Sequence, residues 1–169
     1  MGLRRQAREV ALQALFVSDF SGKWTMESIQ ETFVHFGVSA QVKPFAETLC
    51  QGVMEHLAEI DSEISKSSQN WSITRMSRVD RCILRVACYE ILFMTDVPNR
   101  VAINEAIEIS KRYSADDSPS FINGVLDKLA SNSGLNSKVE TRIEQVKQVS
   151  ESDSSDRDDE LEKILLGSY

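Results

Sequence analysis

The chain has 169 residues, of which 41% are hydrophobic and 27% are charged, as in one compact domain or two small subdomains that share a core. No apolar run approaches the roughly 18 residues that a membrane helix needs, and no signal peptide is recognisable, so we expect a cytoplasmic protein without a membrane partner. The three cysteines, Cys50, Cys82 and Cys88, are odd in number and widely spaced. This pattern predicts buried thiols rather than disulfides or a zinc site.

The sequence contains none of the common motifs of catalysis. It has no glycine-rich phosphate loop, no nucleophile beside a histidine, and no pair of histidines at metal-ligand spacing. His35 and His56 have no acidic or cysteine partner at ligand spacing, so we interpret them as structural histidines. We therefore expect a protein that is not an enzyme and that holds no metal and no cofactor.

The net charge of -7 is unevenly distributed along the chain. Residues 136–169 contain nine acids and five bases, which gives -4, and the other residues therefore carry only -3. The run 150–159 is too polar and too charged to build a core. We expect an acidic, disordered C-terminal tail over 136–169, in which the leucines after residue 160 could form one short helical turn.

Periodic apolar residues predict three helices in the first half of the chain. The first spans residues 4–19, and the second begins after the capping residue Thr25 and ends at Gly37. The third and longest covers residues 42–64, because apolar side chains recur there at spacings of three and four. The polar segment that follows ends it. These helices predict an N-terminal subdomain over residues 3–66.

The second half predicts three more helices in a subdomain over residues 71–131. Ser77, with Asp80 three residues later, is a variant of the capping box and predicts a mostly apolar helix that begins at residue 78. Pro98 precedes the next helix, and a serine followed by proline begins the last one, over 118–131.

Two residues of this half have predicted packing roles. Gly124 lies inside a predicted helix, where glycine costs about 1 kcal/mol relative to alanine, so we expect a close helix crossing there. Glu90 is surrounded by apolar residues in the sequence, so we expect it to be partly buried with a donor such as an arginine.

The basic residues form two clusters. The first contains Arg4, Arg5 and Arg8. Because Arg5, Arg8, Leu12 and Phe16 follow helical spacings of three, four and four, two guanidinium groups and a ring would share one stripe, as a surface for single-stranded RNA requires. A core position for Phe16 is an equally good interpretation. The second cluster contains Arg75, Arg78, Arg81 and Arg85. It predicts either a phosphate-binding patch or arginines paired with nearby acids such as Asp80 and Glu90.

Three strings of residues carry a resemblance to a known family. They are RRQAREVALQAL at 4–15, DRCILRVACYEI at 80–91, and the segments DVP, AINEAI and FINGVLD between residues 96 and 127. In order and spacing they resemble the NusB family of bacterial transcription antitermination factors, over residues 3 to about 131.

The resemblance implies an all-α protein of two three-helix subdomains without catalytic activity. Members of the family bind single-stranded boxA RNA together with NusE, a ribosomal small-subunit protein, and deliver this complex to RNA polymerase during ribosomal RNA synthesis. The resemblance assigns RNA contacts to Arg4, Arg5, Arg8, Phe16 and Phe121, and partner contacts to Asp80 and Asp117.

Two other interpretations remain open at this stage. The chain could be the remnant of a ribosomal RNA cytosine methyltransferase, whose N-terminal domain is similar, although no methyl-donor motif follows residue 131. It could also be a protein-interaction module or a homodimer whose RNA face is occluded. Gln6 interrupts the arginine motif, so we expect binding of RNA without the partner to be weaker than in more basic relatives. We also expect the acidic tail to repel RNA at low salt.

Overall fold

The computed structural model describes residues 2–69 and 71–133 of the chain. Within these ranges all regular secondary structure is helical, which confirms the predicted all-α fold class. The predicted acidic tail, 136–169, lies outside the described residues. No helix in the described part of the chain is long and apolar enough to cross a membrane.

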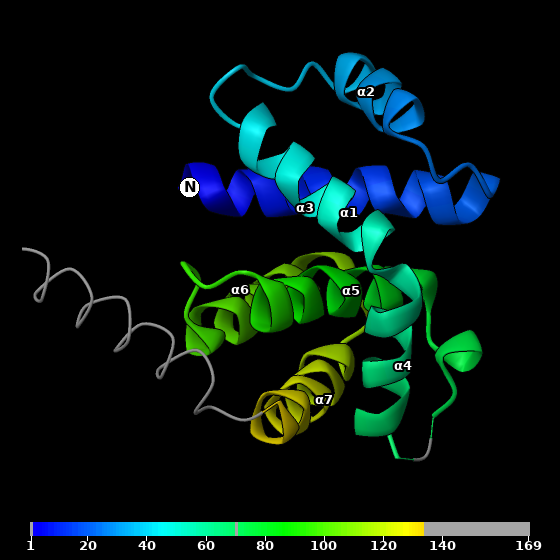
Figure 1. The fold of residues 1–169 in the computed structure, drawn as a ribbon, viewed down its shortest axis with the longest axis vertical. Helices are drawn as coiled ribbons and strands as arrows, with labels where there is room; N and C mark the ends of the chain where they lie inside the picture. The colour runs from blue at the N-terminus through cyan, green and yellow to red at the C-terminus, as the bar shows by residue number, and fades with distance from the viewer. Residues whose placement is uncertain (1, 70, 134–169) are drawn as a thin grey trace, which may run out of the picture. The chain divides into compact units, whose positions relative to one another are not determined.

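Seven α-helices build the folded unit. They are α1 (Leu3–Ser21), α2 (Met26–His35), α3 (Lys43–Glu55), α4 (Leu57–Ser67), α5 (Arg78–Phe93), α6 (Asn99–Tyr113) and α7 (Ser118–Asn132), with a short 3-10 helix at Ile73–Arg75. In Figure 1, α1, α2 and α3 lie in one half of the unit, and the remaining helices lie in the other half. The mostly apolar α5 is central, because α1, α3, α4, α6 and α7 all pack against it.

The helix ends follow the predicted capping residues. The Thr25 hydroxyl accepts a hydrogen bond from the Ser28 N–H at 3.2 Å, and the Ser77 hydroxyl accepts one from the Asp80 N–H at 3.0 Å. Gly37 follows α2 with a φ of 61°, a conformation that glycine adopts without strain. These local signals correctly locate the starts of α2 and α5 and the end of α2.

The predicted long helix over 42–64 is wrong, because the chain forms two helices that break at His56. There the backbone leaves helical geometry, with φ -112° and ψ 18°, and the imidazole stacks on Phe93 with ring centroids 4.0 Å apart. A single-residue break leaves the apolar spacing intact, so periodicity does not reveal it. After the break, α4 packs on α5 and α7. The division into subdomains 3–66 and 71–131 stays a prediction.

The predicted close crossing at Gly124 is also wrong. A Cβ atom there would meet no neighbouring atom within 4 Å. The close approach is instead at Gly52 of α3, where a Cβ would overlap the ring of Tyr89 at Cζ. The ring of Tyr89 therefore occupies the space that a side chain on α3 would need.

The three cysteines are buried and free, as predicted. Burial raises the pKa of the Cys82 thiol to about 12 and raises the pKa values of Cys50 and Cys88 well above their ordinary range. All three thiols are therefore protonated at neutral pH and act as small apolar side chains.

Candidate nucleic-acid interface

The first two arginines of the N-terminal motif reach the surface from α1. Arg4 is exposed and pairs with Asp96 at 3.2 Å. Arg5 donates to both carboxylate oxygens of Glu105 on α6, from Nε at 2.7 Å and from Nη2 at 2.9 Å. The hydrogen bond from Arg5 lowers the pKa of Glu105 and raises that of the guanidinium. Both arginines are thus held by acids while part of each side chain faces solvent.

Arg8 lies in the interior rather than on a lateral stripe. Its side chain is 4% exposed, and Nη2 contacts Oε1 of Glu90 at 2.6 Å, which confirms that Glu90 is buried with an arginine donor. Leu12, the next residue of the predicted stripe, is also buried. These two residues line a small gap between α1, α5 and α6. This part of α1 therefore faces the core.

An aromatic ring supports the arginine motif from α3. The guanidinium carbons of Arg4 and Arg8 lie 4.9 Å and 5.4 Å from the centroid of Phe45, within the range of cation–π attraction. Sequence reasoning missed Phe45, because its place in the apolar repeat of α3 made it an ordinary core residue. The half-buried ring has one side on the core and one side beside the arginines.

Phe16 lies farther along α1, and its neighbouring guanidinium belongs to Arg78 and not to the arginine motif. It is partly buried against the core, and the Arg78 guanidinium lies 5.9 Å from its centroid. The same guanidinium lies 5.2 Å from the ring of Phe20, which is 72% exposed. Phe16 follows Arg5 by eleven positions, about 16 Å along a helix. Phe16 and Phe20 thus form a separate aromatic surface.

Three arginines of the second cluster converge on one carboxylate. Asp19 of α1 accepts hydrogen bonds from Arg78 at 2.7 Å, Arg81 at 2.6 Å and Arg85 at 2.9 Å. Burial acts to raise the pKa of Asp19, but these hydrogen bonds outweigh it and hold the pKa below its ordinary value. Arg85 also binds Asp61 through two hydrogen bonds of 2.8 Å. Pairing with acids is thus the correct interpretation for these three arginines, with Asp19 and Asp61 as the partners.

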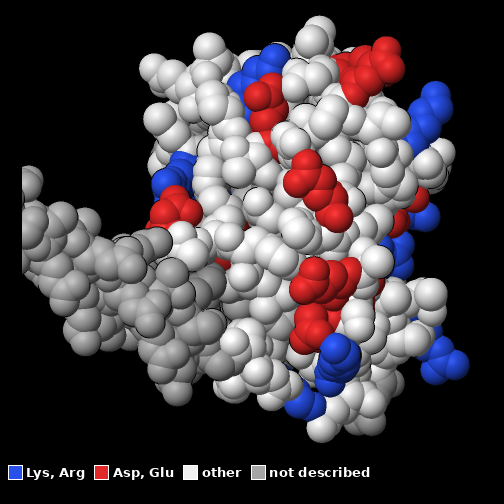
Figure 2. Space-filling view, in the orientation of Figure 1, with Lys and Arg blue, Asp and Glu red and all other residues white. Residues whose placement is uncertain are grey.

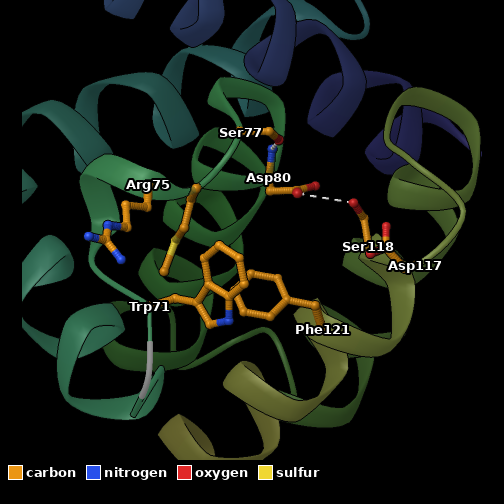
Figure 3. A pocket seen from close by; sticks show the side chains of 8 residues that line it. Trp71, Arg75, Ser77, Asp80, Asp117, Ser118 and Phe121 are labelled. Carbon is orange, nitrogen blue, oxygen red and sulfur yellow. Dashed lines mark hydrogen bonds between the residues drawn. The ribbon is translucent and has the colours of Figure 1, made fainter.

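Asp80, Asp117 and Phe121 line one pocket of about 260 Å³ where the first turns of α5 and α7 meet. Trp71 lies opposite Phe121, with ring centroids 6.4 Å apart at 66°. Figure 3 shows these two rings side by side, with Arg75 and Asp117 on opposite sides of them. The structure thus brings together three of the residues predicted from sequence and adds Trp71 and Arg75.

The two acids of this pocket differ in exposure. Asp80 is buried, and its carboxylate accepts hydrogen bonds from Ser114 at 2.7 Å and Ser118 at 3.0 Å. It therefore ties the start of α5 to the start of α7. Asp117 is exposed at the rim, from which its carboxylate can reach a binding partner.

The surface charge matches this division into small sites. On the face shown in Figure 2, acidic and basic side chains of the described residues are interspersed, and no large basic area stands out. A nucleic acid would thus find separate cationic points on this face rather than one broad positive field.

The comparison with protein families decides the identity of this fold. The NusB family model matches residues 5–131. The chain belongs to the NusB family. The match includes the arginine motif from Arg5 onward, the central α5 and the aromatic pocket, so the surfaces described above lie within the family's domain. As a member of this family, the chain is a non-enzymatic transcription antitermination factor.

Curated relatives agree with this assignment. The chain is 49% identical over 134 residues to the transcription antitermination protein NusB of Trichlorobacter lovleyi, a match that covers 76% of this chain and 91% of the relative. It is 47% identical over 132 residues to the NusB protein of Geobacter sulfurreducens, and this match covers 78% of this chain and 96% of the relative.

Solved structures share the fold. NusB of T. maritima superposes with a TM-score of 0.73 at 39% identity, over 81% of this chain and 96% of that one. A second similar chain comes from a crystal structure of the antitermination factors NusB and NusE in complex with double-stranded RNA. It has a TM-score of 0.71 at 26% identity and covers 78% of this chain and 98% of its own.

Proposed function

We propose that this NusB-family chain binds single-stranded, boxA-type RNA as a heterodimer with NusE. The complex acts in the cytoplasm, where it joins RNA polymerase and promotes transcription of ribosomal RNA. The observation that carries the proposal is the meeting of Phe121 and Asp117 at one open pocket. Phe121 offers an aromatic face to RNA, and Asp117 offers a carboxylate to a basic partner. A solved NusB–NusE complex with RNA, similar in fold, supports both kinds of partner.

The proposed RNA surface has parts with different roles. Arg4 and Arg5 bind phosphates, since both have exposed surface and exchange an acidic partner for an RNA oxygen at small cost. Arg8 is a positioning residue that holds the start of α1 through Glu90 and Glu105. Phe16 and Phe121 supply aromatic faces for unstacked bases.

The two acids also divide the partner contact between them. Asp117 contacts NusE directly from the rim of the pocket, whereas Asp80 fixes the helix ends that carry Asp117. The basic side chains of the partner would complete a positive surface that this acidic chain has only in part.

The test is the binding of a fluorescent boxA-type RNA, followed by anisotropy with and without NusE, with a scrambled RNA as the control. We expect tight, sequence-dependent binding only when NusE is present. Equal binding of both RNAs, or no binding with NusE, would refute the proposal. Sedimentation of the chain alone would then show whether a homodimer covers the RNA face.

Arginine variants separate contact from positioning. Arg4→Gln should flatten the dependence of log affinity on log salt by about 0.7, the value for one phosphate of a single strand, with little loss of stability. Arg8→Gln should instead lower the free energy of unfolding by about 3–5 kcal/mol, because it leaves the carboxylate of Glu90 buried without its charged partner. Chemical denaturation measures that loss.

A further inference from the structure

We propose that Trp71 and Arg75 belong to the RNA-binding surface: the corner between Trp71 and Phe121 receives one unstacked nucleobase, and Arg75 binds a phosphate beside it. This inference rests on the proposed function and assigns residues that the family resemblance does not. It concerns residues 71–77, before α5, which contribute one wall of the pocket.

The geometry of the two rings fits a flat ligand. Trp71 is 54% exposed, and its ring meets that of Phe121 at 66° with centroids 6.4 Å apart. Rings at this angle form an open corner, where a base can stack on one face while its edge contacts the other ring. Stacking on an exposed tryptophan requires no particular base, since every base has a π face.

The interior of the pocket also favours an uncharged, flat group. Met76, which is almost fully buried, contributes an apolar side chain to the lining. The carboxylate of Asp80 is engaged by two serine hydroxyls within the protein. A neutral base can enter such a pocket, whereas a phosphate would be repelled by the carboxylate of Asp80.

The charges at the rim give the bound strand an orientation. Arg75 and Asp117 lie on opposite sides of the rings (Figure 3). Among the described residues Arg75 forms no ion pair, whereas Arg78, Arg81 and Arg85 all bind Asp19. The RNA backbone should therefore pass on the side of Arg75, which attracts phosphate, and leave Asp117 facing the protein partner.

The experiment uses the full chain with NusE and a series of boxA-type RNAs, each with 2-aminopurine at one position. Stacking on Trp71 should quench the fluorescence of one position on binding. Trp71→Leu should restore that fluorescence and weaken binding by about fivefold to a hundredfold, the range for loss of one base–aromatic stack. Trp71→Phe, which keeps a ring, should weaken it less.

Three further variants make the test specific. Arg75→Gln should flatten the salt dependence by about 0.7, whereas Arg75→Lys, which keeps the charge, should preserve it. Phe36→Leu is the matched control, because Phe36 is 50% exposed and lines a different groove. It should leave affinity and fluorescence unchanged.

The outcomes distinguish this inference from the proposed function. If the unmodified chain with NusE binds no RNA, the proposed function fails. If it binds RNA tightly but Trp71→Leu changes neither affinity nor the fluorescence of any position, only the inference is overturned. A Trp71→Leu variant that loses affinity for NusE when RNA is absent would also overturn it, because the pocket would then hold a side chain of the protein partner.

Discussion

At the scale of single residues, the two helical glycines Gly52 and Gly124 have opposite roles. Glycine within a helix costs about 1 kcal/mol relative to alanine. Packing offsets this cost only where a neighbouring side chain fills the space that a Cβ would occupy. At Gly52 the ring of Tyr89 fills that space, whereas at Gly124 the space is open. The sequence shows both as glycines in apolar helices, so periodicity alone could not separate them.

This difference predicts opposite effects of the same substitution. Gly52→Ala should lower the free energy of unfolding by about 1–3 kcal/mol, because the new methyl group displaces the ring of Tyr89 from its stack on Phe93. Gly124→Ala should raise it by about 0.5–1 kcal/mol through the lower entropy of the unfolded chain. Urea denaturation measures both, and equal effects of the two substitutions would contradict the role given to Gly52.

At the scale of elements, ion pairs fix α1 on α5 at both ends of their contact. Arg8 binds Glu90 near the start of α1, and Asp19 binds three arginines near its end. The two helices therefore run antiparallel, with apolar side chains between the ion pairs. This arrangement fixes the start of α1, which carries Arg4 and Arg5, relative to the aromatic pocket at the start of α5.

The Asp19 cluster predicts a stability that depends on pH. Because the pKa of Asp19 is held below its ordinary value of 3.8, its contribution is fully present above that value and is lost as the pH falls through the lower, folded-state pKa. Asp19→Asn should therefore lower the free energy of unfolding at pH 7 by about 1.5–3 kcal/mol, and the difference between the two proteins should shrink between pH 5 and pH 3.

Thermal unfolding at several pH values measures this difference. Asp96→Asn is the matched control, because Asp96 forms an exposed pair with Arg4 and should change stability by at most about 0.5 kcal/mol at any pH. A difference between the Asp19→Asn variant and the original chain that stays constant down to pH 3 would show that the pKa of Asp19 is not lowered.

The same elements show what the sequence could and could not predict. The starts of α2 and α5 were predictable, because Thr25 and Ser77 act on backbone groups within one turn. The partner of the arginine cluster was not, since Asp19 lies 59 to 66 residues away from Arg78 and Arg85 and only tertiary packing brings them together. The break at His56 was hidden for the same reason, because the ring of Phe93 that it stacks on lies on another helix.

The candidate site was predictable to a similar extent. Phe121 and Asp117 came from the family resemblance, and the structure places them at one pocket. Trp71 and Arg75 follow a polar segment without helical periodicity, so no pattern in the sequence linked them to Phe121. Their place in the pocket depends on how residues 71–77 pack against the start of α7.

At the scale of the whole molecule, the charge of the chain opposes its proposed ligand. The net charge is -7 for the full chain and -3 without residues 136–169, which contain nine acids and five bases. A truncated chain of residues 1–135 should therefore bind boxA-type RNA more tightly at low salt, by roughly twofold to tenfold, because less negative charge repels the phosphates. The gain should vanish as the Debye length falls from about 10 Å at 0.1 M salt to about 3 Å at 1 M.

Anisotropy titrations of both chains with NusE, over a range of salt concentrations, measure this gain. Replacing Asp153, Asp156, Asp158 and Asp159 with asparagine in the full chain controls for length, since it removes four negative charges and no residues. If repulsion is the cause, the substituted chain should bind as tightly as the truncated one. If truncation changes neither the affinity at low salt nor the salt dependence, the acidic tail does not oppose RNA binding. Separate contacts, such as those of Arg4 and Arg5, would then determine the affinity, and the net charge of the chain would not.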